Sequence, residues 1–544
     1  MTGPYPWRSE RLLDCVGIVV VAAAATLLLR PFQDAPFVDD WVYAWSVEHL
    51  LDTGRLEVLD FADNFHGVQT LWGLLLCLPF GFSFTALRVS TWLAALAGLC
   101  GLYLLLRELD VPRRDALLGT AALGLYPTFA MLGVTFMTDI PFLSLTILAS
   151  LAMVRALREH RLGWLIVAAV CAALAGGVRV VGVVTPIAML LSLVLGRDNW
   201  GRQRARWAVA LVPMVLFVAM GFWWRSRTHH VADLTWLETS TSDRLANLVF
   251  ALPLLPRMAV ETFGMLAGTL GLALLPLAVA CLPGRTVRWT LAMFGVMVAV
   301  LVACRAAGFG YILPLATGQM WAFNELGGTT TLVPGFGLPR VPALVSWAGL
   351  ALGTVSLAVS STAVVTRRGW KPGEAFLLWS MAGHCGLIAL LWLIHDRYVL
   401  VLVPLAIAVV LSAGPRLNWR VATGALVALA LVTGTGIADH LRYNGALWQA
   451  VDALRRTGVA ERDINGGYMV NGWLQYAHAD RAFHDGQGNV DVAWVNGADE
   501  PPYRIANAPQ VGWTVLDTFD YERRIGPSGR IYVLQAETPA ARSR

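Results

Sequence analysis

The stretch LLDCVGIVVVAAAATLLLR, from Leu12 to Arg30, carries only one charged residue, Asp14, before its terminal arginine. A helix that crosses a bilayer needs about 20 mostly apolar residues, so this stretch predicts a membrane-spanning helix. No clear small-residue cleavage site follows it, so we expect a retained anchor and not a signal peptide.

Runs of the same kind recur along most of the chain. Including the first, we count thirteen in the sequence: 12–30, 86–106, 115–136, 140–157, 162–178, 180–196, 207–224, 259–282, 289–304, 343–365, 375–394, 398–414 and 421–438. Hydrophobic residues make up 57% of the chain and charged residues 14%, against roughly 25% charged in soluble proteins. Lipid is therefore the solvent for much of the chain, and we expect an α-helical polytopic membrane protein. The net charge of +5 comes from arginine-rich loops and does not indicate nucleic acid.

Short basic clusters set the predicted orientation. They are Arg8/Arg11, Arg107/Arg113/Arg114, Arg155/Arg158/Arg161, Arg197/Arg202/Arg204/Arg206, Arg285/Arg288, Arg367/Arg368/Lys371 and Arg416/Arg420. From Arg107 onward, two runs separate consecutive clusters, so the clusters share one face, which the positive-inside rule makes cytoplasmic. The first cluster joins them only if the short run 68–82, with Pro79 and Gly81, does not cross. We therefore place that run in the outer interface.

With thirteen crossings and the basic clusters in the cytoplasm, the first loop, the later outer loops and the tail lie on the extracytoplasmic face. The predicted outer segments are 31–85, the turns near Thr138 and Gly177, 225–258, 305–341, 395–397 and the tail. Arginines at 225, 227, 244 and 257 depart from the rule.

Two domains are expected: a transmembrane domain over 1–439 and a small soluble α/β domain over 440–544. In the tail, Trp448 to Thr457 has a helical pattern. Trp513–Leu516 and Ile531–Leu534 are short apolar runs bounded by Gly and Pro, as strands usually are.

Two adjacent carboxylates mark the first outer loop. Phe37-Val38-Asp39-Asp40 precedes a predicted helix from Trp41 to Leu51 that Gly54 closes. The apolar residues of that helix predict a broad face lying on the membrane surface. An aspartate at a helix start also caps free backbone N–H groups, but two exceed what capping requires. Function and capping both stay open at this point.

Other ionisable residues lie on the same predicted face. Asp139 stands in Thr138-Asp139-Ile140-Pro141, where an N-cap role is again an alternative. Arg179 follows Gly176-Gly177-Val178 between two apolar runs, where a cation needs an anion or a route to water.

His395-Asp396-Arg397-Tyr398 separates two later runs, either as a mutual salt bridge or as a set of donors for a phosphate. His66 opens the interfacial run, and such a histidine is more often a satisfied polar residue than a catalyst.

Carboxylates, arginines and a histidine thus gather at one outer rim. A lipid or sugar transporter or flippase, the main alternative, would place ionisable residues nearer the bilayer midplane. A non-catalytic envelope scaffold is a third hypothesis. The rim position favours an enzyme that acts on a lipid-linked substrate.

Several of these motifs resemble those of the GT-C glycosyltransferases, in particular the branch of protein O-mannosyltransferases and lipid A aminoarabinose transferases. Phe37 to Tyr43, with the following Leu50-Leu51-Asp52-Thr53-Gly54, is similar to the first-loop acidic motif. Thr138 to Pro141 is similar to the second acidic motif. Asp396-Arg397-Tyr398-Val399-Leu400 and Ala86-Leu87-Arg88-Val89 also match. The likeness covers roughly residues 12–440.

The chain departs from the family pattern in three places. The first motif reads Asp-Asp where Asp-Glu is usual. His66-Gly67-Val68-Gln69 stands where the family has His-Pro-Pro-Leu or Lys-Pro-Pro-Leu. The Trp-Trp-Asp signature of oligosaccharyltransferases is absent from the sequence.

The resemblance implies transfer of a sugar from a polyprenyl-phosphate-linked donor to a protein, lipid or glycan acceptor, with inversion. It implies Asp39 as general base and Asp139 as its partner or as the residue that positions the acceptor. Arg179 and Arg397 would bind the phosphate. The remaining substrate-binding candidates are Asp40, His66, Asp396 and Tyr398.

The loop 305–341, with Gln319, Trp321, Asn324 and Glu325, would close over the sugar. No cofactor is required, and a Mg²⁺ or Mn²⁺ ion between Asp39 and Asp40 is a further hypothesis. The expected location is the inner (plasma) membrane of a bacterial envelope, with the site and the tail on the extracytoplasmic face.

Overall fold

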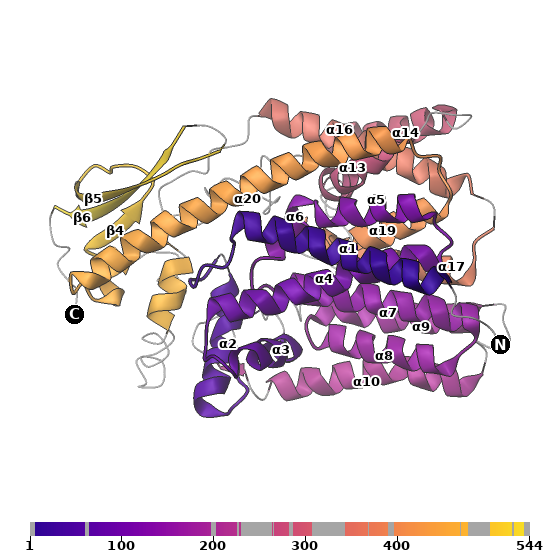
Figure 1. Ribbon diagram of the computed structural model, residues 1–544, viewed down its shortest axis with the longest axis horizontal. Helices are drawn as coiled ribbons and strands as arrows, with labels where there is room; N and C mark the ends of the chain where they lie inside the picture. The colour runs from indigo at the N-terminus through magenta and orange to yellow at the C-terminus, as the bar shows by residue number, and fades with distance from the viewer. Residues whose placement is uncertain are drawn as a thin grey trace.

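The computed structural model describes most of the transmembrane part and about two thirds of the tail. The described residues are 6–37, 39–59, 62, 65–196, 203–225, 228–229, 264, 266–281, 287–306, 343–367, 369–389, 396–467, 469–476, 501–524 and 527–537. Helices run side by side through most of the molecule, and a small sheet lies beside one end of the long helix α20 (Figure 1). The predicted class, a helical polytopic protein with a small sheet-bearing tail, is confirmed.

The first half of the chain supplies the centre of the bundle. Its elements are α1 (Pro6–Leu29), α2 (Asp40–Thr53), β1 (Val58–Leu59), α3 (Gly67–Cys77), α4 (Phe84–Glu108), α5 (Arg113–Gly124), α6 (Pro127–Leu132), α7 (Asp139–Glu159), α8 (Leu162–Gly176), η1 (Val180–Val183), α9 (Val184–Leu195), α10 (Arg204–Arg225) and β2 (Thr228–His229). In the most apolar stretch of α7, 83% of residues are buried by protein, against 6% in α1. Since α1 is apolar and yet uncovered, we infer that it faces lipid.

The second half packs around this centre and ends in the tail. Its elements are the π-helix η2 (Leu266–Gly271), α13 (Leu272–Ala278), α14 (Val287–Ala306), α16 (Ala343–Val365), α17 (Pro372–Ala389), α18 (Asp396–Val399), α19 (Leu402–Ser412), α20 (Trp419–Arg456), η3 (Glu461–Asp463), β3 (Ile464–Asn465), β4 (Tyr503–Ala506), β5 (Trp513–Tyr521) and β6 (Gly529–Ala536).

Each of the thirteen predicted runs overlaps a helix. Within the described ranges, six helices are long and apolar enough to cross a membrane, and further apolar helices are shorter. Thirteen crossings therefore stay a prediction. The run 115–136 is not one helix, because Tyr126 precedes Pro127 and adopts an extended conformation that ends α5.

The last predicted span and the tail helix also differ from expectation. Residues 421–438 and the helical stretch from Trp448, up to Arg456, belong to one 38-residue helix, α20, and Thr457 is its C-cap. At 1.5 Å per residue it measures about 57 Å, well beyond the roughly 30 Å of a hydrocarbon core. The predicted domain boundary at 439/440 falls inside this helix.

The short helix α3 supports the interfacial placement of run 68–82. It has 11 residues and ends at Cys77, before Pro79. Its length, about 16 Å, is roughly half the hydrocarbon thickness.

Described members of four basic clusters, Arg11, Arg107, Arg155 and Lys371, meet at one end of the bundle. Glu108 at the end of α4 accepts hydrogen bonds from Arg11 at 2.6 Å and Arg155 at 3.0 Å. Lys371 pairs with Asp110 at 2.8 Å. The opposite end of α7, 21 residues or about 32 Å away, carries Asp139. The candidate site and the basic clusters thus lie about one bilayer thickness apart.

The tail forms a four-stranded sheet in the order β3-β4-β6-β5, with β3 and β4 parallel and the other neighbours antiparallel. The two predicted strands are confirmed within the longer β5 and β6.

Aromatic contacts dock the tail on the first loop. Trp448 Nε1 donates to Pro36 O at 3.1 Å. The Trp473 ring lies 4.9 Å from the Phe84 ring. A Cβ at Gly472 would lie 2.3 Å from the Trp41 ring, so only glycine permits this close backbone approach. The tail therefore covers part of the loop that carries Asp39.

Candidate active site

Asp39 directly precedes α2, and its side chain does not cap the helix. It occupies the N-cap position, yet its side chain makes no capping hydrogen bond. Instead Oδ2 of Asp39 accepts a hydrogen bond of 3.1 Å from Nη1 of Arg397, in α18. The Asp39 side chain is 27% exposed and can be approached from outside. Of the two interpretations open for this residue, the structure disfavours capping.

Asp40 faces the other way and is buried. Its Oδ2 lies 3.2 Å from Nη2 of Arg88 in α4, and both side chains are fully buried. Its Oδ1 accepts the Phe37 N–H at 2.6 Å, and the Arg88 guanidinium lies 3.6 Å from the centre of the Phe37 ring. Arg88 also donates to the backbone carbonyls of Gln33 and Ala35. Asp40 and Arg88 thus fix the loop that presents Asp39.

The pKa of Asp40 reflects this burial. Removal from water raises its pKa to about 6, although the charge of Arg88 and the hydrogen bond from Phe37 act in the opposite direction.

The helix α2 does not lie on the membrane by a single apolar face, which corrects the prediction. Four consecutive residues, Trp41 to Ala44, are buried, so protein surrounds its first turn on every side. The predicted end of the helix is confirmed, because Gly54 adopts the left-handed conformation with φ 69°.

Asp139 pairs with Arg179. Asp139 is the first residue of α7, and one of its oxygens, Oδ1, accepts from Nη1 of Arg179. The carboxylate is only 3% exposed, and its Oδ2 has no hydrogen-bond partner among the described residues. Arg179 extends from the break between α8 and η1, where the Gly177 carbonyl accepts the Val68 N–H at 3.1 Å. The second oxygen of this buried carboxylate thus keeps unused hydrogen-bonding capacity among the described residues.

The short helix α18 presents Arg397 and Tyr398 to these acids. Asp396 is fully buried; Oδ2 accepts from Thr128 Oγ1 at 3.2 Å, and Oδ1 accepts the backbone N–H of Arg397 at 2.9 Å. Asp396 therefore anchors α18 to α6 from behind the site.

Tyr398 joins the two ion pairs. The guanidinium carbon of Arg179 lies 5.3 Å from the centre of the Tyr398 ring, and that of Arg397 lies 5.4 Å from it. Both distances are within the range of cation–π attraction. One aromatic ring thus contacts the two cations that the sequence analysis assigned to phosphate.

The charges behave as one cluster. Burial opposes the positive form of Arg397, but the electrostatic influence of Tyr398, Asp39, Asp139 and Tyr43 outweighs it and holds the pKa of Arg397 well above its usual value. The surrounding groups therefore favour the positively charged form of Arg397.

His66 lies behind the ion pairs and contacts α2 residues Ser46 and Tyr43. It is fully buried, its Nε2 is 3.2 Å from Ser46 Oγ, and its ring meets the Tyr43 ring edge to face at 5.0 Å. The structure places it between α2 and α3, as a support for Tyr43.

Three contributing residues received no role from the sequence. They are Arg88, which stands in a motif that matches the family, Tyr43 and Thr128. A buried arginine near the start of a span needs an anion, and this rule would have identified the first of them.

Within the described ranges, Asp39 and Asp40 do not converge on a common cation site. In the part of the chain that the structure covers, no three His, Cys, Asp or Glu side chains are grouped to hold a metal. Asp39 and Asp40 each face a guanidinium from a different helix. This donor set does not fit the predicted Mg²⁺ or Mn²⁺ between them.

Some predicted residues lie outside the described ranges. These are His395 and the loop residues Gln319, Trp321, Asn324 and Glu325.

A family model matches part of the chain. Residues 70–223, from α3 through α10, match the model described as dolichyl-phosphate-mannose-protein mannosyltransferase. The matched segment contains Arg88, Asp139 and Arg179. It confirms the predicted resemblance and the prediction that the chain is a glycosyltransferase. No curated protein matches the sequence.

Solved structures align with the chain at low identity. ArnT from Cupriavidus metallidurans in the apo state aligns with a TM-score of 0.43 and 13% identity, over 96% of this chain and 99% of that chain. The same protein bound to undecaprenyl phosphate aligns with a TM-score of 0.44 and 13% identity, over 95% of this chain and 97% of that chain. The archaeal oligosaccharyltransferase AglB from Archaeoglobus fulgidus, in complex with an inhibitory peptide and a dolichol-phosphate, aligns with a TM-score of 0.43 and 12% identity. This alignment covers 91% of this chain and 69% of that chain.

Proposed function

We propose that this membrane glycosyltransferase moves a sugar from a polyprenyl-phosphate donor to an extracytoplasmic acceptor, with Asp39 as general base and with inversion at the anomeric carbon. The observation that carries the proposal is the pair of ion pairs, Asp39–Arg397 and Asp139–Arg179, around the ring of Tyr398. The family match over residues 70–223 supports the same class of donor.

The chemistry requires two tasks at once. The acceptor oxygen must lose its proton as it forms a bond to the anomeric carbon. On the opposite side of that carbon, the bond to the phosphate oxygen breaks and the phosphate leaves with the electron pair. Attack opposite to the leaving group inverts the configuration.

Arg179 and Arg397 supply the positive charge for the leaving phosphate. Arginine binds phosphate through paired, charge-assisted hydrogen bonds, and such bonds contribute more where water is excluded. Both side chains are largely buried. Without donor, carboxylates neutralise both cations, so an arriving phosphate competes with Asp39 for Arg397.

This competition prepares the base. When Arg397 turns to the phosphate, Asp39 loses the partner that stabilises its charge and becomes a better proton acceptor. A positioned carboxylate of this kind accelerates such a step by roughly 10²–10⁴-fold. The exposure of Asp39, against the burial of Asp139, assigns proton removal to Asp39.

Asp139 positions a hydroxyl group of the acceptor or of the sugar through its unpaired Oδ2. Asp40, Asp396 and His66 hold the loop, α18 and Tyr43 in place, so we assign them positioning roles instead of direct phosphate binding.

The extracytoplasmic location follows from charge. The site lies at the end of the bundle opposite the basic clusters, and the positive-inside rule assigns those clusters to the cytoplasm. The contacts of the tail with the first loop support a position of the tail on the same side, where it would help to select the acceptor. The predicted two-domain division and the inner-membrane location are part of this proposal.

The test is transfer from a labelled polyprenyl-phosphate sugar in membranes that contain the full chain. Asp39→Asn should lower the rate at least about 10²-fold. Asp34→Asn is the matched control, because Asp34 lies in the same loop but accepts hydrogen bonds from Ser83 and Thr85 at the start of α4. A near-normal rate for Asp39→Asn would remove the assigned base.

Removal of divalent cations provides a second test, which asks whether Asp39 and Asp40 hold a metal ion. Transfer that stops in EDTA and recovers with Mg²⁺ or Mn²⁺ would restore the metal hypothesis and contradict the mechanism given above.

A further inference from the structure

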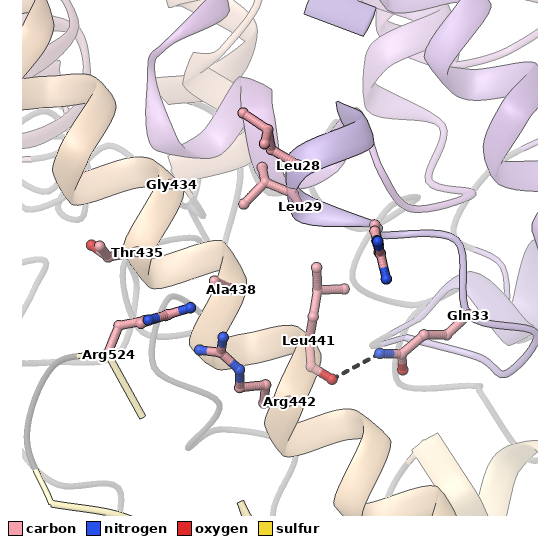
Figure 2. Close-up of a pocket in the computed structure, with 10 residues that line it drawn as sticks. Leu28, Leu29, Gln33, Gly434, Thr435, Ala438, Leu441, Arg442 and Arg524 are labelled. Carbon is pink, nitrogen blue, oxygen red and sulfur yellow. Dashed lines mark hydrogen bonds between the residues drawn. The ribbon is translucent and has the colours of Figure 1, made fainter. Parts of the chain in front are cut away.

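A second basic site lies away from the ion pairs. A pocket of about 580 Å³ opens between the end of α1, the middle of α20 and the segment after β5 (Figure 2). It shares no lining residue with the candidate active site. Its lining includes Leu28, Leu29, Arg30, Gln33, Arg442 and Arg524.

Among the described residues, the pocket carries more positive than negative charge. Three of its lining residues are arginines and none is acidic. Asp439, buried beneath the pocket, lies 3.5 Å from Arg442 Nη1 and accepts the backbone N–H of Arg524 at 2.5 Å. The side chains of Arg30 and Arg524 have no hydrogen bond or ion pair with any described residue. Within the described part of the chain, the one carboxylate in contact with the arginines of the lining is thus that of Asp439.

The pocket lies where two spans leave the apolar part of the membrane. The apolar run of α1 ends at Leu29, and Arg30 follows it directly. On α20, the apolar run ends near Ile437 and Asp439, His440 and Arg442 follow. Two neighbouring helices that change from apolar to charged at one level mark the head-group region of a bilayer.

An apolar wall adjoins the charged one. Leu28 is 86% exposed, and Gly434 and Ala438 offer a surface of small residues on α20. Figure 2 shows Leu28 and Leu29 on one side of the pocket, with Arg442 and Arg524 on the other. A free anion would use only the arginines, whereas a lipid would use both walls.

The walls are braced in place. Gln33 Nε2 donates to Leu441 O at 3.0 Å and ties the end of α1 to α20, as the dashed line in Figure 2 marks. The Tyr443 and Tyr521 rings meet at 5.7 Å and hold the tail against the same helix.

We infer that this pocket binds the phosphate-bearing head group of a membrane lipid, with the acyl chains along Leu28 and α20. Guanidinium groups match phosphate in charge and in hydrogen-bond geometry. The site is independent of the proposed transfer reaction.

The test is native mass spectrometry of the full chain released from micelles that contain equal amounts of phosphatidic acid and phosphatidylcholine with the same acyl chains. The wild type should retain phosphatidic acid in preference. Arg442→Gln/Arg524→Gln should lose affinity by roughly fivefold for each arginine removed, the factor that corresponds to the contribution of one basic residue near an anionic surface. Arg416→Gln/Arg420→Gln, at the other end of α20, is the matched control and should retain the lipid.

Equal retention by the wild type and the pocket variant, or equal loss in the control variant, would overturn the inference. Complete displacement of the lipid by excess inorganic phosphate would also overturn it, because the site would then bind a soluble anion. If the double variant does not fold, Arg30→Gln replaces it, with an expected loss of roughly fivefold.

Discussion

Nη1 of Arg397 lies 3.1 Å from Oδ2 of Asp39, although 358 positions separate the two residues in the sequence. The contact joins the first outer loop to the short helix α18, and the ring of Tyr398 extends it to Arg179 and Asp139. The proposed base and the proposed phosphate ligand are therefore partners before the donor arrives.

Replacement of Arg397 should affect the leaving group. Arg397→Gln removes the cation, so transfer should fall by about 10²-fold or more. Arg397→Lys keeps the charge but loses the planar, two-point contact with phosphate, and should retain an intermediate rate. Steady-state kinetics with the polyprenyl-phosphate sugar would check this order, and equal rates for Gln and Lys would contradict the charge-based role.

Tyr398 should matter for its ring. Tyr398→Phe keeps the aromatic face between the two guanidinium groups and should transfer sugar at nearly the wild-type rate. Tyr398→Leu removes two cation–π contacts of about 0.5–2 kcal/mol each, and should raise the KM for the donor several-fold. The same KM in both variants would show that the ring does not position the arginines.

The buried pair of Asp40 and Arg88 should respond unequally to mutation. In Arg88→Met, Asp40 can take up a proton and become neutral, whereas in Asp40→Asn the guanidinium stays charged and buried. Asp40→Asn should therefore lower the free energy of unfolding by about 3–5 kcal/mol, which is more than Arg88→Met should lower it. The double variant should be more stable than Asp40→Asn in denaturant unfolding from detergent micelles. The reverse order of the two single variants would contradict a charged, buried pair.

Asp40 also predicts a dependence of stability on pH. Burial raises its pKa from 3.8 to about 6 in the folded protein. The contribution of the protonated Asp40 carboxyl to folding stability is fully present below about pH 3.8 and is lost as the pH rises through about 6. Between these values the unfolded chain releases this proton while the folded protein keeps it, so the unfolded state gains stability relative to the folded state. The change is about 3 kcal/mol at most. The double variant Arg88→Met/Asp40→Asn has no such group, and its stability should vary less with pH between 4 and 6.

The fold class and the main charged residues were predictable from local patterns. Apolar runs of about 20 residues identify helices, and the basic clusters place Asp39, Asp139, Arg179 and Arg397 at one end of the bundle. The break before Pro127 also follows from a local rule, although the sequence analysis treated that run as continuous.

The pairing of these residues was not predictable, because it depends on contacts between distant segments. Asp396 is adjacent to Arg397 in the sequence, yet its carboxylate binds Thr128 and a backbone N–H, while Asp39 receives the guanidinium. The continuity of α20 was also hidden, because the polar residues near Asp439 look like the end of a span although the helix extends beyond it. Packing against the tail sheet stabilises that extension.

The most direct test is the affinity of polyprenyl phosphate for the wild type and for Asp39→Asn, measured at equilibrium together with sugar transfer. If Asp39 and the donor phosphate compete for Arg397, the variant should bind polyprenyl phosphate more tightly than the wild type while its transfer rate collapses. Equal or weaker binding by Asp39→Asn would contradict the competition, and with it the proposed link between donor binding and the base.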